Sequence, residues 1–177
     1  AGVCSLKIEG RMKRPEYVAT VVRVYRRALD SCLAGDFSVA REDREALKQI
    51  FNRDFTTAYM KGAPGKGLIS HARPNNRGLF AGRVISYDAV RKQVTVKTVT
   101  KLSSGDQLDF WVKVGGRVAV TLEKMYVNGK PVEHAEANVN VTFPMDKRVS
   151  PNDRFFKVYD RDLMVLAKES YTGDCKR

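Results

Sequence analysis

The chain of 177 residues is poor in the residue types that build disulfide scaffolds and metal centres. It contains three cysteines and two histidines, which are Cys4, Cys32, Cys175, His71 and His134. The cysteines are far apart with no C-x-x-C pair, which is typical of reduced thiols in a cytoplasmic protein. The histidines have no acid or cysteine at metal-ligand spacing, so we expect ordinary surface residues. The sequence therefore predicts no metal site and no cofactor in this chain.

Long apolar runs are also missing. No segment approaches the ~18–20 consecutive apolar residues of a membrane-spanning helix, and the first residues lack the basic start and apolar centre of a signal peptide. Hydrophobic residues make up 43% of the chain and charged residues 29%, which is ordinary for a folded protein with its own core. These features predict a cytoplasmic protein without membrane contact.

Acidic residues are scarce in one stretch of a chain whose net charge is +12. Residues 61–101 hold nine basic residues and a single acid, Asp88, whereas residues 102–146 hold four basic and six acidic residues. Such segregation favours a basic face that binds a polyanion, and the alternative is a surface that only keeps the protein soluble. The candidate nucleic-acid-binding residues are Lys61, Lys66, Arg73, Arg77, Arg83, Lys92 and Lys97.

Residues 1–60 predict a single βα unit followed by a second helix. An apolar strand over residues 3–8 leads into a helix that begins at Pro15, which suits the first helical position, and ends at Gly35. A second helix is expected after the N-cap Ser38, with its end near Asn52. Apolar residues follow helical spacing at Val18, Val21, Val22, Tyr25, Leu29 and Cys32, and again at Leu47, Ile50 and Phe51.

The βα junction indicates a site that needs more than this chain. Charged residues at the end of a parallel strand usually face a ligand, and Glu9 and Arg11 hold those positions. Glu9 suits an acid/base or metal-ligand role and Arg11 a bidentate clamp on a carboxylate or phosphate; the alternative is an ion pair that holds a barrel rim. Because the chain has one such junction at its start, it reads as the tail of a larger enzyme, and we expect it to be inactive alone.

Residues 61–78 read as a basic connector. The segment is rich in glycine and proline, and Gly62-Ala63-Pro64-Gly65-Lys66-Gly67 has neither the spacing nor the Ser or Thr of a Walker A motif. The chain also lacks H-E-x-x-H and a nucleophile elbow. A self-contained protease is therefore not expected.

From Gly78 onward the hydrophobic pattern has period two. The predicted strands are Leu79–Tyr87, Gln93–Thr100, Gln107–Val114, Arg117–Val127, Asn138–Phe143 and Arg154–Tyr159. Asn128-Gly129 is a strong hairpin dipeptide. Six short strands with close turns predict a mostly β fold with an N-terminal α segment, in which residues 79–177 form a small closed six-stranded antiparallel β-barrel.

Two further patterns lie in the β region. Residues 102–108 and 149–155 form a weak repeat in which Asp106 and Asp153 occupy equivalent turn positions, so we expect both to be structural turn residues. Aromatic pairs occur at Phe110-Trp111 and Phe155-Phe156. One member of each must face the core, and the other either stacks on bases or plugs a barrel end.

Three ordered blocks resemble peptidase family U32, the collagenase-like peptidases. They are Ser5-Leu6-Lys7-Ile8-Glu9-Gly10-Arg11-Met12-Lys13 with Pro15-Glu16-Tyr17-Val18, then Phe51-Asn52-Arg53-Asp54-Phe55-Thr56-Thr57-Ala58-Tyr59, then Arg73-Pro74-Asn75-Asn76-Arg77-Gly78 with Gly82-Arg83-Val84. The resemblance runs from residue 1 to about residue 160. Asp54 and Ala58 depart from the glycines that are frequent in the second block.

The resemblance implies a catalytic TIM-like barrel upstream of this chain, with residues 1–33 as its last strand and helix. It implies that the C-terminal barrel is similar to the second domain of elongation factor Tu. Some family members are described as collagen proteases, and others take part in oxygen-independent hydroxylation of RNA bases or quinones with iron–sulfur clusters and prephenate. The resemblance places any metal or cluster on residues outside this chain.

Three roles follow for the chain. The first is an RNA-binding module, favoured by the basic stretch and the translation-factor-like barrel. The second is an accessory domain that docks a protein substrate such as collagen. The third is a structural barrel that packs on the missing catalytic barrel or forms a homodimer through the exposed side of the N-terminal helix.

Overall fold

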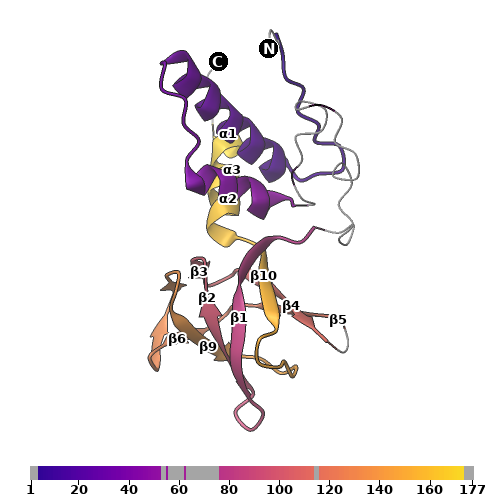
Figure 1. Cartoon of the computed structure of the whole chain (residues 1–177), viewed down its shortest axis with the longest axis vertical. Helices are drawn as coiled ribbons and strands as arrows, with labels where there is room; N and C mark the ends of the chain where they lie inside the picture. The colour runs from indigo at the N-terminus through magenta and orange to yellow at the C-terminus, as the bar shows by residue number, and fades with distance from the viewer. Residues whose placement is uncertain (1–3, 53–54, 56–61, 63–75, 114–115, 174–177) are drawn as a thin grey trace.

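The computed structural model describes residues 4–52, 55, 62, 76–113 and 116–173. Three helices gather above one end of a coiled β-sheet (Figure 1). The helices are α1 (Pro15–Leu33), α2 (Arg41–Ile50) and α3 (Arg161–Thr172). Since α1 packs against both other helices and α2 contacts β1 and β10, the helical part rests on the sheet through α2.

Eight strands form one antiparallel sheet with the order β5-β4-β10-β1-β2-β9-β6-β7. In chain order they are β1 (Leu79–Asp88), β2 (Gln93–Thr98), β4 (Gln107–Val112), β5 (Gly116–Thr121), β6 (Met125–Val127), β7 (Lys130–Val132), β9 (Asn140–Pro144) and β10 (Arg154–Tyr159). β3 (Leu102–Ser103) and β8 (His134–Ala135) form a separate antiparallel pair.

The predicted closed six-stranded barrel is wrong, because the sheet has two open edges. Within the described residues no ladder joins β5 to β7, and the sheet has eight strands. The predicted strand Arg117–Val127 is divided at Leu122, which places β6 and β7 in a short hairpin at the far edge. Pro131 lies in β7. Proline within a sheet is found mainly in edge strands, because it has no N–H to donate to a neighbouring strand. The Asn128-Gly129 hairpin prediction is confirmed, since Val127 pairs with Lys130 across it.

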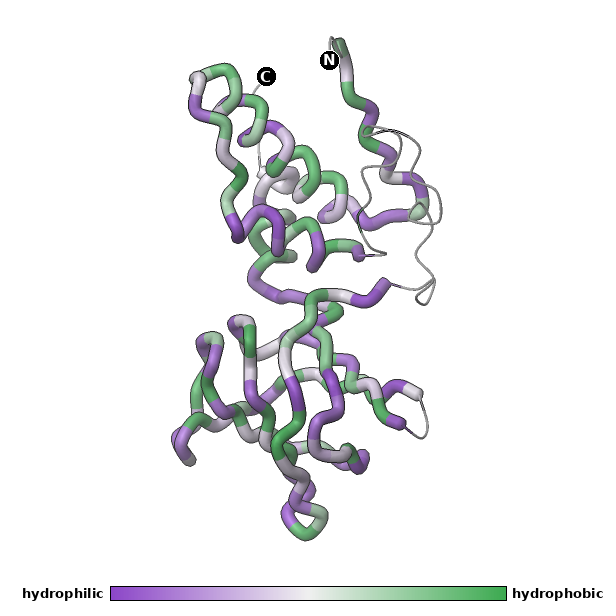
Figure 2. Tube along the Cα trace, viewed as in Figure 1, coloured by the Kyte–Doolittle hydropathy of each residue, from purple (hydrophilic) through white to green (hydrophobic). Residues whose placement is uncertain are grey.

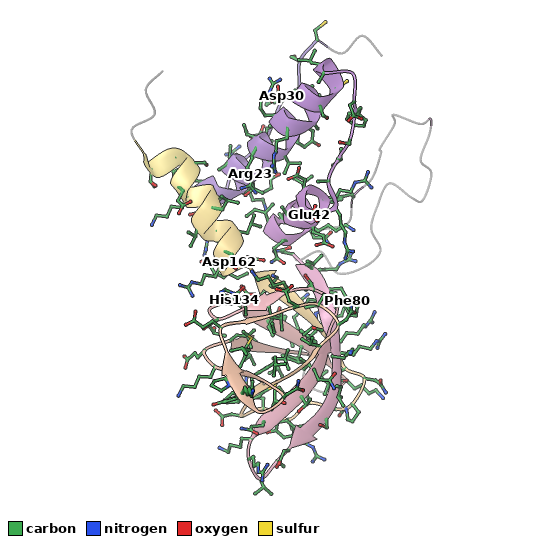
Figure 3. All side chains as sticks on the ribbon, turned by 90° about the vertical axis from the view of Figure 1, so that its left-hand side faces the viewer. Arg23, Asp30, Glu42, Phe80, His134 and Asp162 are labelled. Carbon is green, nitrogen blue, oxygen red and sulfur yellow. The ribbon has the colours of Figure 1, made fainter. Side chains whose placement is uncertain are left out.

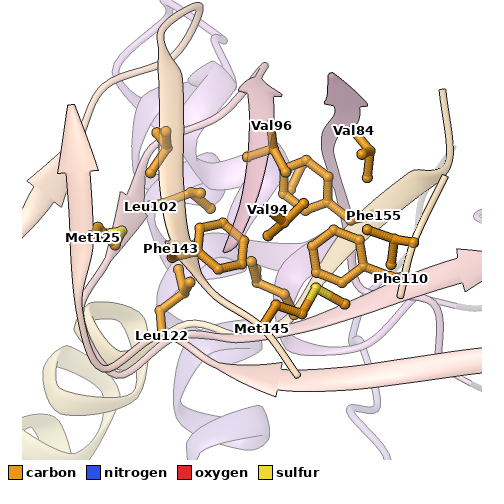
Figure 4. Packing of buried hydrophobic residues seen from close by; sticks show 14 of the residues in the cluster. Val84, Val94, Val96, Leu102, Phe110, Leu122, Met125, Phe143, Met145 and Phe155 are labelled. Atoms are coloured by element: carbon orange, nitrogen blue, oxygen red, sulfur yellow. The ribbon is translucent and has the colours of Figure 1, made fainter. Parts of the chain in front are cut away.

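The open sheet nevertheless coils around one hydrophobic core (Figure 4). Phe110 of β4 and Phe143 of β9 lie on distant strands, yet their ring centroids are 6.2 Å apart. Phe155 of β10 stacks on Phe110 at 5.1 Å. All three side chains are fully buried, so the two halves of the sheet pack on each other without a continuous ladder.

Two turns, at Asp106 and Asp153, have the same hydrogen bonds, which confirms the repeat of residues 102–108 and 149–155. The Asp106 carboxylate accepts a hydrogen bond from the Ser103 N–H at 2.9 Å, and the Asp153 carboxylate accepts from the Ser150 N–H at 2.8 Å. The carbonyls of these aspartates accept from Leu122 and Val84 respectively, each at 2.9 Å. The residues before the aspartates, a glycine and an asparagine, both have positive φ. The structural role predicted for both aspartates is therefore confirmed.

The helical part agrees with the sequence prediction only in outline. Helix α1 begins at Pro15 as predicted. The predicted N-terminal strand is wrong, because residues 4–10 form no strand with any part of the chain that the structure describes. Ser38 does not cap α2: the cap position is Ala40, and Ser38 exchanges hydrogen bonds with Ser31.

Helix α3 was not predicted. Its N-cap is Asp160, whose side chain accepts from the Leu163 N–H at 2.9 Å. The helix packs against α1, and the Tyr171 hydroxyl donates to Glu16 of α1 at 2.7 Å. This hydrogen bond lowers the pKa of the Glu16 carboxyl. The C-terminal end of the described chain thereby joins the N-terminal helices.

Helix α1 has apolar residues on more than one side (Figure 2). Val21 and Val24 are buried within the chain, whereas the stripe formed by Val18, Val22, Tyr25 and Leu29 stays exposed. We call these four residues the α1 stripe. Val21, which shares the helical spacing of these residues in the sequence, is covered by the chain itself.

Candidate functional site

A row of cations crosses the outer face of the sheet. Arg83 of β1 lies directly opposite Arg154 of β10 on one side and opposite Lys97 of β2 on the other. The core residues of these strands, such as Val84 and Phe155, point to the opposite face. We call Arg83, Lys97 and Arg154 the cationic row.

Aromatic side chains continue the row toward β5. Trp111 of β4 is the register partner of Arg154 and of Arg117. The guanidinium carbon of Arg117 lies 5.3 Å from the Trp111 ring centroid, and that of Arg154 lies 5.8 Å from it, which is cation–π distance. One face of the sheet thus alternates cations with an aromatic ring.

Two phenylalanines extend this aromatic surface. Phe156 lies 4.4 Å from Trp111 and 5.5 Å from Phe80, measured between ring centroids. The structure confirms that one aromatic residue of each sequence pair faces the core, since Phe110 and Phe155 are fully buried. Their neighbours Trp111 and Phe156 lie on the outer face.

The cationic row has no acidic partner among the residues that the structure describes, since no described carboxylate lies within 4.0 Å of its side chains. Arg83 donates instead to the Asn152 carbonyl at 3.0 Å, and Lys97 to the Asn138 carbonyl at 2.7 Å. Arg117, by contrast, is paired with Asp109 at 3.3 Å. Like charges directly opposite each other on adjacent strands destabilise a sheet, so the row is electrostatically unfavourable unless an anion binds.

A groove lies beside the row on β1 and β2, and we call it the β1–β2 groove. Its volume is about 470 Å³, and it is lined by Phe80, Gly82, Arg83, Val84, Ile85, Lys97, Val99, Pro151 and Asn152. Two members of the cationic row therefore line a groove whose other side chains are mainly apolar. A concave, mostly apolar surface with a few polar groups is the usual form of a small-ligand site.

A second cluster brings together serine, histidine and aspartate, which invites comparison with a hydrolase triad. The Ser103 hydroxyl donates to Asp162 at 2.9 Å and lies 3.1 Å from His134 Nδ1. His134 and Asp162 lie at the end of the sheet that faces the helices (Figure 3). In a catalytic triad the histidine lies between serine and carboxylate, whereas here the serine is central and buried. The cluster ties β3 and β8 to α3 and does not activate a nucleophile.

A buried ion cluster lies between the sheet and α3. Lys157 is 4% exposed; its ammonium contacts Asp160, donates to the Lys101 carbonyl at 3.0 Å and lies 3.6 Å from Asp106. Burial raises the pKa of the Asp106 carboxyl, while the Lys157 ammonium and two backbone N–H groups oppose the rise. Every polar group of this cluster has a partner within the fold, so we assign it a structural role.

The candidate residues from the sequence divide into three groups. Arg83 and Lys97 belong to the cationic row. Lys92 forms an ion pair with Asp146 at 3.2 Å, and Arg77 precedes β1, where its backbone N–H donates to the Asn52 carbonyl. Lys61, Lys66 and Arg73 lie outside the described residues.

The predicted catalytic pair is not assembled within the described chain. Glu9 is exposed and paired with Lys7 at 3.2 Å, and Arg11 lies in an exposed turn. The described residues also include no group of three His, Cys, Asp or Glu side chains that is placed to hold a metal ion. Cys4 and Cys32 are both exposed, and Cys175 and His71 lie outside the described residues. The described residues thus do not fit an iron–sulfur cluster.

Sequence reasoning missed Arg154 and Phe80 as site residues, whereas Trp111 belonged to an aromatic pair whose outer member was considered for base stacking. Arg154 stands immediately before the predicted core residue Phe155, so strand alternation placed it on the outer face. What remained hidden was the strand order, because β1 ends at Asp88 and β10 begins at Arg154, and the two pair only in the tertiary structure.

The model of peptidase family U32 matches residues 1–70. The chain belongs to peptidase family U32. Over 163 residues it is 33% identical to a tRNA hydroxylation protein of Bacillus subtilis, covering 88% of this chain and 38% of that protein. Over 169 residues it is 28% identical to a collagenase of Porphyromonas gingivalis, covering 92% of this chain and 46% of that protein.

The name of a third relative refers to ribosomal RNA. The 23S rRNA 5-hydroxycytidine synthase of Escherichia coli is 31% identical over 134 residues, which are 70% of this chain and 20% of that protein. The chain therefore spans less than half the length of these curated relatives. A crystal structure of the C-terminal domain of a Geobacillus thermoleovorans U32-family protein is similar with a TM-score of 0.43 and 23% identity, covering 45% of this chain and 91% of that chain.

None of the helices in the described part of this U32-family chain combines the length and hydrophobicity that crossing a membrane requires.

Proposed function

We propose that this chain is the RNA-recognition part of a U32-family protein and that the outer face of β10, β1 and β2 binds the RNA. The cationic row carries the proposal. Three cations stand side by side on adjacent strands with no described acid to neutralise them. A phosphate backbone supplies the missing negative charges and releases counterions when it binds.

The aromatic surface beside the row supports RNA over other polyanions. Trp111, Phe156 and Phe80 adjoin the cations on the same face. Base–aromatic stacking next to a positively charged groove is how sequence-tolerant RNA-binding surfaces work. The names of two relatives, a tRNA hydroxylation protein and a 23S rRNA 5-hydroxycytidine synthase, point in the same direction.

Fluorescence anisotropy with a structured RNA at several salt concentrations tests the proposal. The triple variant Arg83→Ala/Lys97→Ala/Arg154→Ala should weaken binding at least about tenfold and reduce the slope of log K against log salt by about 2, at ~0.7 per lost phosphate contact. Its matched control is Lys124→Ala/Lys130→Ala/Lys147→Ala, which removes the same charge from exposed positions outside the row. Equal losses in the two variants would mean that only net charge matters.

A second candidate function is docking of the helical part on another protein surface. The α1 stripe favours it, since Val22 is 46% exposed and Tyr25 and Leu29 are each 44% exposed on one side of a helix. Such a stripe is normally buried against another element. We propose a second copy of the chain as its partner.

A further inference from the structure

The β1–β2 groove has a floor that the fold itself does not explain. Phe80, Ile85 and Val99 line it with 37%, 41% and 39% of their surface exposed. Isolated exposed apolar residues are ordinary, but a contiguous apolar surface between charged groups marks a binding site. The three residues lie on the outer face, away from the core that the other side of the sheet encloses.

The backbone has an irregular conformation beside this floor. The pairing of β1 with β10 shifts register between Phe80 and Gly82, which is a β-bulge. Gly82 has a φ of 147°, and a Cβ at this position would lie 2.0 Å from the Lys97 carbonyl oxygen. No other residue type fits there without moving β2, so the bulge and the close approach of the strands belong together.

The two cations of the groove are held in place by the backbone. Arg83 bonds the Asn152 carbonyl and Lys97 bonds the Asn138 carbonyl. A guanidinium has five N–H donors and an ammonium has three, so each side chain has donors left for a ligand. These hydrogen bonds hold the guanidinium of Arg83 and the ammonium of Lys97 beside the groove. A ligand that fits therefore has an apolar planar part on the floor and anionic groups next to it.

We propose that the β1–β2 groove holds one unpaired nucleobase of a single-stranded RNA segment, with the base on Phe80 and the adjoining phosphates on Arg83 and Lys97. The inference rests on the proposed RNA-binding function and deepens it. In an RNA duplex the bases are stacked inside the helix and cannot reach an apolar floor, whereas unpaired bases can be splayed onto aromatic side chains. The chain therefore prefers single-stranded RNA to duplex.

The test compares a short single-stranded RNA that carries one 2-aminopurine with the blunt duplex of the same sequence. We expect the single strand to bind at least about tenfold more tightly and its 2-aminopurine fluorescence to change on binding. Phe80→Leu keeps an apolar side chain beside Phe156 but removes the ring. It should lower single-strand affinity about tenfold, the scale of one lost stacking contact, and leave duplex affinity unchanged.

Controls separate the groove from folding and from general electrostatics. Phe37→Ala removes an exposed phenylalanine of the helical part and should leave both affinities unchanged. Phe80→Tyr retains the ring and should bind as the parent chain does. Thermal unfolding of each variant shows whether a loss of binding reflects a loss of fold.

The outcomes distinguish this inference from the proposed function. Equal affinity for single strand and duplex, with no effect of Phe80→Leu, would overturn the base site while RNA binding by the cationic row remained. No binding of either RNA at low salt would overturn both. Binding of collagen-like peptides that is insensitive to salt and weakened by Phe80→Leu would assign the groove to a protein segment instead.

Discussion

The sheet part of the molecule encloses its own core, whereas the helical part does not. The large side chains of the sheet core, such as Phe110, Phe143 and Phe155, are at most 1% exposed. In α1 only Thr20, Val21 and Val24 are buried, and in α2 the buried residues are the polar Asp43 and Gln49. Leu33 of α1 is 81% exposed.

The difference shows which part is a complete folding unit. A sheet that coils around sixteen buried residues can be stable alone. Three short helices with a polar and partly open interface are expected to be less stable by themselves, because helices in proteins gain most of their stability from packing of an apolar face. The helical part is therefore built as a connection and the sheet part as a support for the outer binding face.

Removing a core ring from the sheet should have the largest effect. Phe155→Ala deletes a fully buried ring that stacks on Phe110 at 5.1 Å. It should lower the free energy of unfolding by about 3–5 kcal/mol, measured in urea. Val22→Ala in the α1 stripe should change it by less than about 0.5 kcal/mol. Similar losses for the two variants would contradict the claim that the sheet is the stable unit.

The turns at Asp106 and Asp153 test how the sheet part is connected to the helical part, because only Asp106 also contacts α3. Asp106→Ala should cost about 1–3 kcal/mol because it leaves buried N–H groups without an acceptor. The cost should exceed that of Asp153→Ala. Both carboxylates cap a serine N–H, but Asp106 also accepts from the Arg161 N–H of α3 at 2.9 Å and lies next to buried Lys157.

Chemical denaturation gives the two costs, and hydrogen exchange shows where they act. Asp106→Ala should speed amide hydrogen exchange in α3 as well as in the sheet, whereas Asp153→Ala should speed it in the sheet alone. Equal exchange in α3 for both variants would show that Asp106 does not couple the two parts.

The smallest effect on stability is expected for a charge placed in the α1 stripe. Val22→Asp should leave the unfolding of the sheet unchanged but abolish self-association, which light scattering over a range of protein concentrations measures. Arg26→Ala removes the same net charge from an exposed position of the same helix and serves as the control. A chain that is monomeric at every concentration before mutation would refute the second copy as partner.

Local signals in the sequence predicted many elements. Pro15 marked the start of α1, the Asn128-Gly129 dipeptide marked the β6–β7 hairpin, and the repeat identified Asp106 and Asp153 as turn residues. Each of these depends on the conformation of a few neighbouring residues. The helix α3 was missed although Asp160 is an N-cap, because its short apolar pattern continues directly from the strand β10.

Non-local properties escaped prediction. Whether the sheet closes depends on the pairing of β5 with β7, which are separated in the sheet order by all the other strands. Two of the three residues of the cationic row, Arg83 and Lys97, were predicted from local charge. Arg154 joins them only because β10 pairs with β1. The catalytic roles predicted for Glu9 and Arg11 remain predictions.

The sequence by itself determined the alternation of inward and outward side chains, the turns and the basic character of this U32-family chain, because these follow from backbone conformation and composition. Only the tertiary structure decided which outward residues become neighbours. Strand order and a β-bulge at Gly82 bring three cations and an aromatic surface to one face. Contacts between distant segments depend on packing of the whole core, and that packing is not encoded in any local stretch.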